Sequence, residues 1–321
     1  MAIWAGIDEA GYGPLLGPLV VAGTAFRTGE VPTEGALWDQ LSVAISRNFA
    51  HADGRLIVND SKVVYSRRKG LRALEEGVLG FLSVRHPRLS NCGKLFSAIF
   101  HPSVSPTDRS PWWEGIEKLI LPRKANISSI DSKAAPLKIS LQKESLAFLG
   151  IRAITVLPSE YNKIVSHTRN KANLLWQKCG LLLQRLWRFA NKESVFVLVD
   201  RHGGRVHYRK LLCDAFPECQ IDVVQEGPAG SSYEISHNQD QMHVAFKKNG
   251  DQRALPVALA SMTAKYVREL YMIVFNRYWQ KELPDLKPTA GYARDARRFL
   301  ADIKPLLENS EIDRRSLIRE Q

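Results

Sequence analysis

Two adjacent acidic residues near the start of the chain, Asp8 and Glu9, are placed where carboxylates can bind a cation. They follow a short apolar run, residues 2–7, which has the composition of a buried strand. A strand ends at the edge of its sheet, and carboxylate oxygens there are suitable ligands for a hard cation such as Mg²⁺. The alternative is that both acids are solvated side chains in a polar turn.

A turn rich in glycine and proline, residues 10–18, comes directly after these acids. Its glycines allow backbone N–H groups to approach a ligand closely. Gly11 and Gly13 have the spacing of half a dinucleotide-binding fingerprint, but that motif requires a helix to follow. Pro14, Pro18 and the β-branched residues after them favour a second strand instead, so we expect a hairpin here.

Three further acids lie beside predicted strand or helix ends. Asp200 follows the apolar run 195–199, and it can either cap a following helix or project into a site at the sheet edge. Asp251 precedes a long helix predicted from residue 255, whose positive end would attract it. Glu226 follows another predicted strand and competes with Asp251 for a place in the same site. These residues alone leave the alternatives open.

A polar segment at residues 59–62 contains another candidate site. Asp60 has the position of a helix N-cap, although it could be mistaken for a metal ligand. Ser61 and Lys62 are suited to contact phosphate groups, and the basic residues at 67–69 would extend that face. The sequence leaves the capping and the phosphate-binding interpretations open.

The composition indicates a folded protein with a polyanionic partner. The 321 residues include 45 Lys and Arg against 33 Asp and Glu, a formal net charge of +12, and 45% of them are hydrophobic. This excludes a fully disordered chain and favours nucleic acid or an anionic membrane surface as partner. No apolar stretch is long enough to span a membrane and the first residues contain no basic leader, so we expect a cytoplasmic monomer without a membrane partner. The four cysteines lack C-x-x-C spacing, which argues against a zinc or redox motif.

Strand-like and helix-like segments alternate along most of the chain. Strands are expected at residues 2–7, 17–26, 151–158, 195–199, near 224 and at 241–247, and helices at 64–84, 172–190, 255–279 and 293–308. This order predicts an α/β fold with a mixed central β-sheet flanked by helices, formed by residues 1–84 and 149–321. Residues 85–148 are rich in proline and show no apolar period, so we expect an inserted loop-rich lobe.

Taken together and in this order, these segments resemble the motifs of the type 2 ribonuclease H family (RNase HII). The matching segments are residues 7–18, 59–62, 198–200, 250–265, 291–292 and 314–316. The resemblance implies a ribonuclease H-like fold and hydrolysis of the RNA strand of RNA/DNA hybrids, or incision at ribonucleotides embedded in duplex DNA. It also implies two divalent cations, Mg²⁺ or Mn²⁺, roughly 4 Å apart, one to activate water and one to stabilise the leaving oxygen.

The resemblance also implies roles for particular residues. The catalytic, metal-binding acids would be Asp8, Glu9, Asp200 and Asp251. The substrate-binding residues would be Gly11, Tyr12, Gly13, Ser61, Lys62, Lys265 and Tyr292. Among these, the glycine turn would face the ribose 2′-OH, which distinguishes RNA from DNA. The tyrosine near the C-terminus would stack on the neighbouring deoxyribose, and the two lysines would hold phosphates.

Three features depart from the family pattern. Tyr12 stands between the glycines where relatives have Arg or Lys, so a cationic phosphate contact is lost and an aromatic ring is gained. Ala290 stands where relatives often have lysine. Residues 85–148 have no counterpart in the compact bacterial relatives, and Trp112 and Trp113 there form either an added nucleic-acid surface or a small satellite core. A non-catalytic hybrid-binding protein and a DNA-directed nuclease on the same fold are the alternatives.

Overall fold

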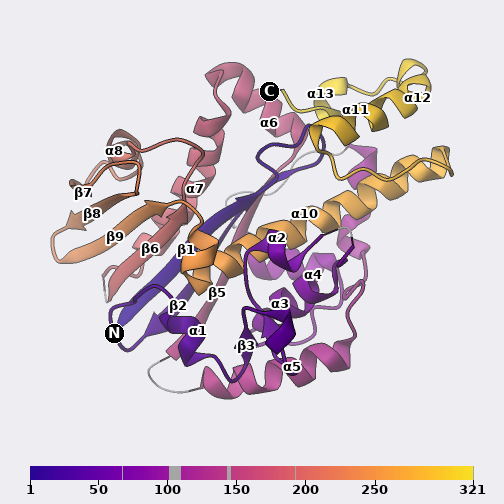
Figure 1. Ribbon diagram of the computed structural model, residues 1–321. Coiled ribbons are helices and arrows are strands. Elements are labelled where there is room, and N and C mark those ends of the chain that lie inside the picture. Colours follow the sequence, from indigo (N-terminus) through magenta and orange to yellow (C-terminus); the bar gives the residue numbers. More distant parts are fainter. Residues whose placement is uncertain (67, 101–109, 143–145, 192, 321) are drawn as a thin grey trace.

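A mixed seven-stranded sheet forms the centre of the protein (Figure 1). The computed structural model describes residues 1–66, 68–100, 110–142, 146–191 and 193–320. From one edge to the other the strands are β5 (Leu146–Val156), β2 (Leu19–Thr28), β1 (Ala2–Ala10), β6 (Ser194–Asp200), β9 (Asp240–Lys247), β8 (Ser231–His237) and β7 (Gln220–Gln225). β1 is antiparallel to β2 but parallel to β6, and β6 is parallel to β9. The predicted α/β fold with a mixed central sheet is therefore confirmed, and three parallel strands end at the same edge.

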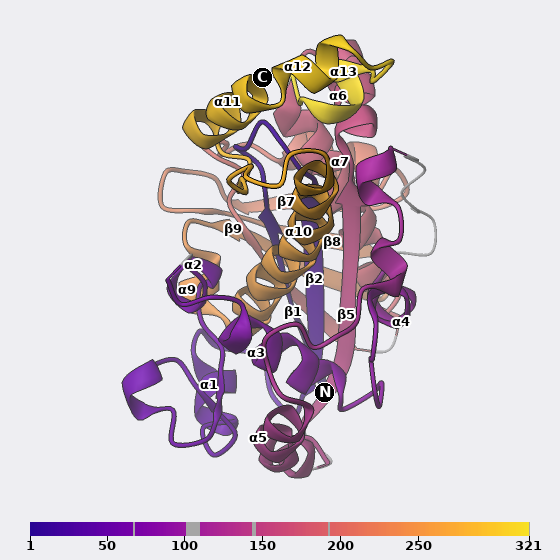
Figure 2. The same ribbon diagram turned by 90° about the vertical axis from the view of Figure 1, so that its right-hand side faces the viewer.

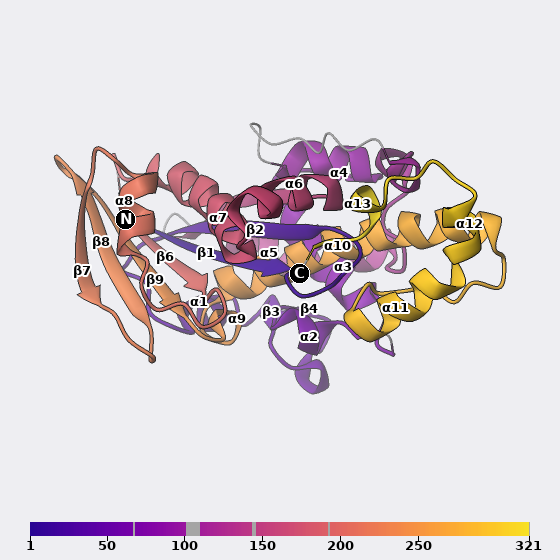
Figure 3. The same cartoon turned by 90° about the horizontal axis from the view of Figure 1, so that it is seen from above.

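Helices cover both faces of this sheet (Figures 2 and 3). On one face, α10 (Leu255–Glu282) lies along β1 and β2, and α3 (Arg72–Leu82) packs beside it. α6 (Pro158–Thr168), α7 (Lys171–Trp187) and α8 (Arg209–Ala215) cover the other face. The close approach of α10 requires a glycine in β1, because a Cβ atom at Gly6 would lie 2.2 Å from the backbone nitrogen of Val257. This contact fixes α10 against the strand that carries Asp8 and Glu9.

Shorter elements complete the fold. They are α1 (Ala36–Gln40), β3 (Ile45–Ser46), η1 (Phe49–His51), β4 (Leu56–Ile57), α2 (Ser61–Val64), α9 (Gly250–Arg253), α11 (Ala293–Asp302), α12 (Lys304–Glu308) and α13 (Arg314–Leu317). β3 and β4 pair in a separate small sheet. Within the described ranges, no helix combines the length and the apolar character that a membrane span requires.

The segment at residues 85–148 contains more helix than its sequence pattern indicates. Its described part includes α4 (Cys92–Ile99), α5 (Ile127–Ser140) and the 3-10 turns η2 (Pro111–Trp113) and η3 (Ile116–Lys118), whereas residues 101–109 and 143–145 lie outside the described residues. Trp112 and Trp113 are buried and pack against Phe275 of α10. The two tryptophans therefore belong to the main core on the α10 side of the sheet, not to a small satellite core, and their rings are not exposed for stacking on bases.

Two predicted helices are divided in the structure. The helix predicted at residues 293–308 is interrupted at Ile303, because Pro305 lies in the first turn of α12 and has no N–H to continue the hydrogen-bond ladder. In place of the helix predicted at residues 64–84, α2 ends and α3 begins on either side of a turn that contains the left-handed Gly70. The other predicted strands and helices are present, with somewhat shifted ends.

Candidate active site

Four acids from three distant parts of the sequence line one cavity of about 630 Å³. Asp8 and Glu9 lie at the end of β1, Asp200 is the last residue of β6, and Asp251 lies in α9 directly after β9. Because β1, β6 and β9 run parallel, their carboxyl ends meet at one edge of the sheet. The structure thus brings together the four acids that the sequence motifs indicated.

Burial and mutual repulsion disfavour the charged forms of these acids. Burial, followed by repulsion from Asp200, raises the pKa of Glu9 to about 7. Burial, followed by repulsion from Asp60 and Asp200, raises the pKa of Asp251 to about 7. Burial and repulsion from Glu9 raise the pKa of Asp8 well above its ordinary value, and burial raises the pKa of Asp200. The cavity therefore has a surplus of negative charge that a bound cation would relieve.

A fifth carboxylate, Asp60, lies in the same cavity, although the sequence indicated only a capping role for it. Its side chain does cap α2, since it accepts a hydrogen bond from the backbone N–H of Lys62 at 2.8 Å. It also lies close enough to Asp251 to raise the pKa of that carboxyl group, and only 7% of its surface is exposed. The next residue, Ser61, lines the cavity as well. No sequence signal separates such an aspartate from an ordinary helix cap.

The donor set of the cavity fits a hard divalent cation. Carboxylate oxygens are the ligands that Mg²⁺ and Mn²⁺ prefer. Lys62 also faces these acids: burial lowers its pKa, but attraction to Asp60, Asp251 and the other acids outweighs burial, so the pKa is raised. Within the described residues, no three Asp, Glu, His or Cys side chains are already arranged to hold a metal ion. Ion binding would therefore draw the carboxylates closer together.

The glycine turn forms another wall of the cavity. Gly11 has a φ of 88°, and a Cβ atom there would lie 2.4 Å from the carbonyl oxygen of Pro18, so other residues are excluded. Around Gly13, by contrast, no atom lies within 4 Å of the position a Cβ would take, so its backbone borders open space. The N–H of Leu15 donates to the carbonyl of Gly291 at 2.8 Å. The turn is thus held firmly while part of its backbone faces the cavity.

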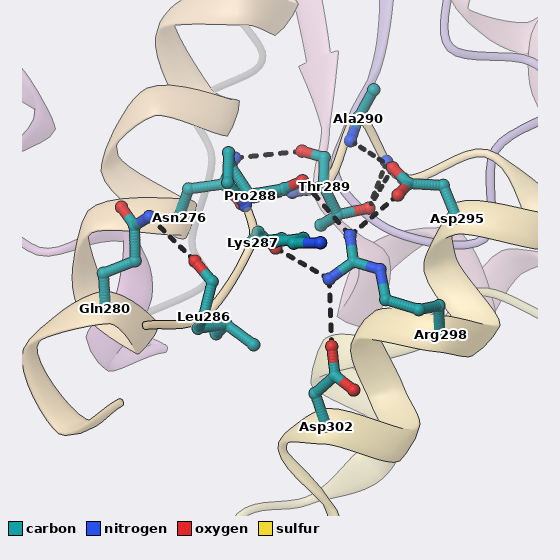
Figure 4. Close-up of polar contacts among 11 residues, drawn as sticks. Asn276, Gln280, Leu286, Lys287, Pro288, Thr289, Ala290, Asp295, Arg298 and Asp302 are labelled. Atoms are coloured by element: carbon teal, nitrogen blue, oxygen red, sulfur yellow. Dashed lines mark hydrogen bonds and ion pairs between the residues drawn. The ribbon is translucent and has the colours of Figure 1, made fainter. Parts of the chain in front are cut away.

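The loop before Tyr292 is fixed by a network of polar contacts (Figure 4). Asn276 of α10 donates to the carbonyl of Thr289 at 2.9 Å and accepts a hydrogen bond from its N–H at 2.7 Å. Asp295 accepts hydrogen bonds from the Thr289 hydroxyl and from the N–H of Ala290, both at 2.8 Å. Tyr292 lines the cavity and remains 49% exposed. A sugar or base can therefore reach this ring while the loop beneath it stays anchored.

The two lysines expected to contact phosphates both line the cavity, but in different environments. Lys62 faces the acids. Lys265 forms a salt bridge with Glu269 at 2.7 Å, and its ammonium lies 4.6 Å from the centroid of the Tyr65 ring. The charge of Lys265 is therefore largely offset by its neighbour. Arg67, predicted to extend the basic face, lies outside the described residues.

Glu226, the alternative to Asp251, does not line this cavity. It accepts a hydrogen bond from the Tyr233 hydroxyl and pairs with His207 at 2.6 Å. Burial raises the pKa of Glu226, but the hydrogen bonds from Tyr233 and His207 outweigh burial, and the pKa is lowered. Of the two acids, Asp251 is the one that joins the cluster.

Comparison with known proteins gives structural similarities without a sequence match: no family model and no curated protein matches the chain. The PCNA:RNase HII complex from Archaeoglobus fulgidus is similar at 16% identity and a TM-score of 0.41, over 99% of this chain and 94% of that one. Ribonuclease H2 from Pyrococcus horikoshii OT3 is similar at 11% identity and a TM-score of 0.44, over 99% of this chain and 92% of that one. Bst-RNase HIII in complex with Mn²⁺ is similar at 13% identity and a TM-score of 0.38, over 94% of this chain and 62% of that one. These proteins carry the family name that the motifs suggested, but with TM-scores below 0.5 the function proposed below depends on the site of this chain.

Proposed function

We propose that this protein is a metal-dependent ribonuclease H, which hydrolyses the RNA strand of RNA/DNA hybrids or incises duplex DNA at embedded ribonucleotides. The observation that supports this is the convergence of Asp8, Glu9, Asp200 and Asp251 in one cavity beside the glycine turn. Buried carboxylates with raised pKa values are suited to hold a divalent cation next to a phosphodiester. The net charge of +12 also suits a polyanionic substrate.

The four acids, with Asp60 beside them, would hold Mg²⁺ or Mn²⁺. When bound, such a cation lowers the pKa of water and offsets charge that develops on the reacting phosphate. Residues of the chain orient the ligands: the N–H of Glu9 donates to Asp8 at 2.7 Å, and the N–H of Gly250 donates to Asp200 at 2.8 Å. These contacts limit the orientations of both carboxylates before any ion binds.

The rim of the cavity would select the substrate. The backbone around Gly11 and Gly13 would face the ribose 2′-OH, so a deoxyribose at the same place would leave that hydrogen bond unmade. Tyr292 would stack on the neighbouring deoxyribose. Lys62 would contact a phosphate once a cation offsets the acids around it. Preference for a ribonucleotide would therefore come from the turn and the ring together.

Incision of a labelled DNA duplex that contains one ribonucleotide tests this proposal. We expect cutting at the ribonucleotide in Mg²⁺ or Mn²⁺ and none in a chelator. Asp8→Asn should remain folded and lose at least about 100-fold in cleavage rate, because a bound metal supplies several kcal/mol of transition-state stabilisation. Asp39→Asn makes the same chemical change at an exposed position in α1, and it should cut normally.

Other outcomes of this experiment would indicate a different function. A folded protein that binds the duplex in a salt-dependent way but never cuts it would be a non-catalytic hybrid-binding protein. Equal cutting of an all-DNA duplex would indicate a DNA-directed nuclease. Normal cutting by Asp8→Asn would show that the acidic cavity is not the catalytic centre.

A further inference from the structure

A lysine at the start of α7 lies against the tyrosine of the glycine turn. The ammonium of Lys171 is 5.3 Å from the centroid of the Tyr12 ring, within the range of a cation–π contact. Tyr12 lines the acidic cavity, whereas Lys171 does not. Tyr12 also lies close enough to interact electrostatically with both Glu9 and Arg205. The ring therefore lies near the acids of the cavity and near two cations, Lys171 and Arg205, that do not line it.

These two cations differ from the lysines inside the cavity. Lys62 is surrounded by acids, and Lys265 is paired with Glu269. Among the described residues, neither Lys171 nor Arg205 forms a salt bridge, and the charge contacts of both are with aromatic rings. Their charge is therefore available to an anion that reaches this side of the turn.

A nucleic acid needs such charge at the edge of this cavity. When one linkage lies at the acids, the adjacent phosphates of the same strand pass over the rim, where the acids repel them. A cation that contacts Tyr12 but does not line the cavity offsets that repulsion without entering the space that a metal ion would occupy. The aromatic ring also restricts the long lysine side chain, so less conformational entropy is lost when a phosphate binds it.

We propose that Lys171 binds a backbone phosphate next to the cleaved linkage, and that the Tyr12 ring positions the Lys171 ammonium for this contact. The proposal rests on the nuclease function proposed above. Lys171 is then a substrate-binding residue and Tyr12 a positioning residue. The cation needed beside the glycine turn is supplied by a helix that is distant in sequence.

Binding measured without cleavage tests this proposal. The protein carrying Asp8→Asn is titrated into a labelled duplex with one ribonucleotide, over a series of salt concentrations. Adding Lys171→Gln should weaken binding and reduce the steepness of the log–log salt dependence by about 0.9, the value for one phosphate contact on duplex DNA. The control Lys138→Gln removes a lysine from α5, at the other end of the protein, and should leave that slope unchanged (Figure 1). Melting temperatures should be the same in all these proteins.

Substitutions of Tyr12 distinguish a positioning role of its ring from an effect of the Lys171 charge alone. Tyr12→Phe should bind normally, whereas Tyr12→Ala should weaken binding and should add little to Lys171→Gln in the double variant, since both remove the same contact. Tyr12→Arg in the Lys171→Gln protein should restore the slope, because it returns one cation to this position.

An unchanged slope in Lys171→Gln, or fully additive effects of Tyr12→Ala and Lys171→Gln, would overturn the proposal. If the protein cuts its substrate normally and the slope is unchanged, only this inference fails. If the protein carrying Asp8→Asn binds no duplex or hybrid at any salt concentration, the nuclease function fails with it.

Discussion

Asp200 repels three other carboxylates in the cavity, so its replacement by asparagine should stabilise the metal-free protein. Repulsion from Asp200 contributes to the raised pKa values of Asp8, Glu9 and Asp251. Asparagine removes the charge but keeps an oxygen that can accept the hydrogen bond from the N–H of Gly250, now 2.8 Å long. Asp200→Asn therefore changes the electrostatics of the cavity with little change in its shape.

The size of the effect follows from two pKa values and depends on pH. The pKa is raised from 4.5 to about 7 for Glu9 and from 3.8 to about 7 for Asp251. A carboxyl group whose pKa is raised by folding contributes to the stability of the folded state. This contribution is complete when the pH is below the ordinary pKa, and it is lost as the pH rises through the pKa of the folded state. At about 1.4 kcal/mol per pH unit, ionising either group costs roughly 3–4 kcal/mol at pH 8. Because burial is the larger cause, removing Asp200 should recover about 1–3 kcal/mol of this.

Urea unfolding in a chelator at pH 5 and pH 8 measures the difference. At pH 8, Asp200→Asn should have a larger free energy of unfolding than the unchanged protein. This difference should be smaller at pH 5, where the carboxyl groups with raised pKa values are protonated in both proteins. Cleavage activity should be lost in the same variant. The exposed control Asp39→Asn should alter neither stability nor activity. A variant that is less stable at pH 8, or that differs equally at both pH values, would refute the reasoning that these carboxylates repel one another.

Adding Mn²⁺ should raise the melting temperature of the protein at pH 8 and raise that of Asp200→Asn much less; equal shifts in a thermal unfolding experiment would place the ion elsewhere. Glu75→Gln should lower the free energy of unfolding by about 3–5 kcal/mol, because the buried carboxylate accepts hydrogen bonds at 2.5–2.8 Å from the N–H groups of residues 123–125 and from the Tyr266 hydroxyl. If urea unfolding shows a decrease of less than about 1 kcal/mol in the free energy of unfolding, the hydrogen bonds of Glu75 do not stabilise the fold in this way. Tyr292→Ala should raise the KM for incision at a ribonucleotide without changing the melting temperature, and Tyr292→Phe should behave normally; an equal loss in both would argue against stacking.

The positions of the first acids could be predicted because they depend on strand ends. Asp8 and Asp200 each follow an apolar run, and the two runs pair in parallel, so their ends coincide. The choice between Asp251 and Glu226 could not be made in this way, since both follow a strand. It depends on the order of strands in the sheet: β9, which leads to Asp251, lies beside β6, whereas β7, which leads to Glu226, lies at the far edge.

Contacts between distant segments account for most of what the sequence did not indicate. Asp60 reaches the cavity because α2 packs against α10, where the hydroxyls of Ser61 and Ser261 lie 3.0 Å apart. The pairing of Lys265 with Glu269 could have been predicted, because residues four apart lie on one face of a helix. β8 was missed because its residues are mostly polar, and only alternate side chains point into the core.

Helix α10 sets the geometry of the whole site, because it contacts both the acids and the rim. Ser261 lies close enough to Asp8 to oppose the rise in the pKa of that carboxyl group. Two turns further along the same face, the fully buried Arg268 donates to the carbonyls of Leu16 at 3.2 Å and Ala290 at 2.9 Å, which joins the glycine turn to the loop that carries Tyr292. The position of the acids relative to the glycine turn and the Tyr292 loop is therefore set by one helix, although the turn and the loop are themselves irregular. This explains how segments from opposite ends of the sequence form one site.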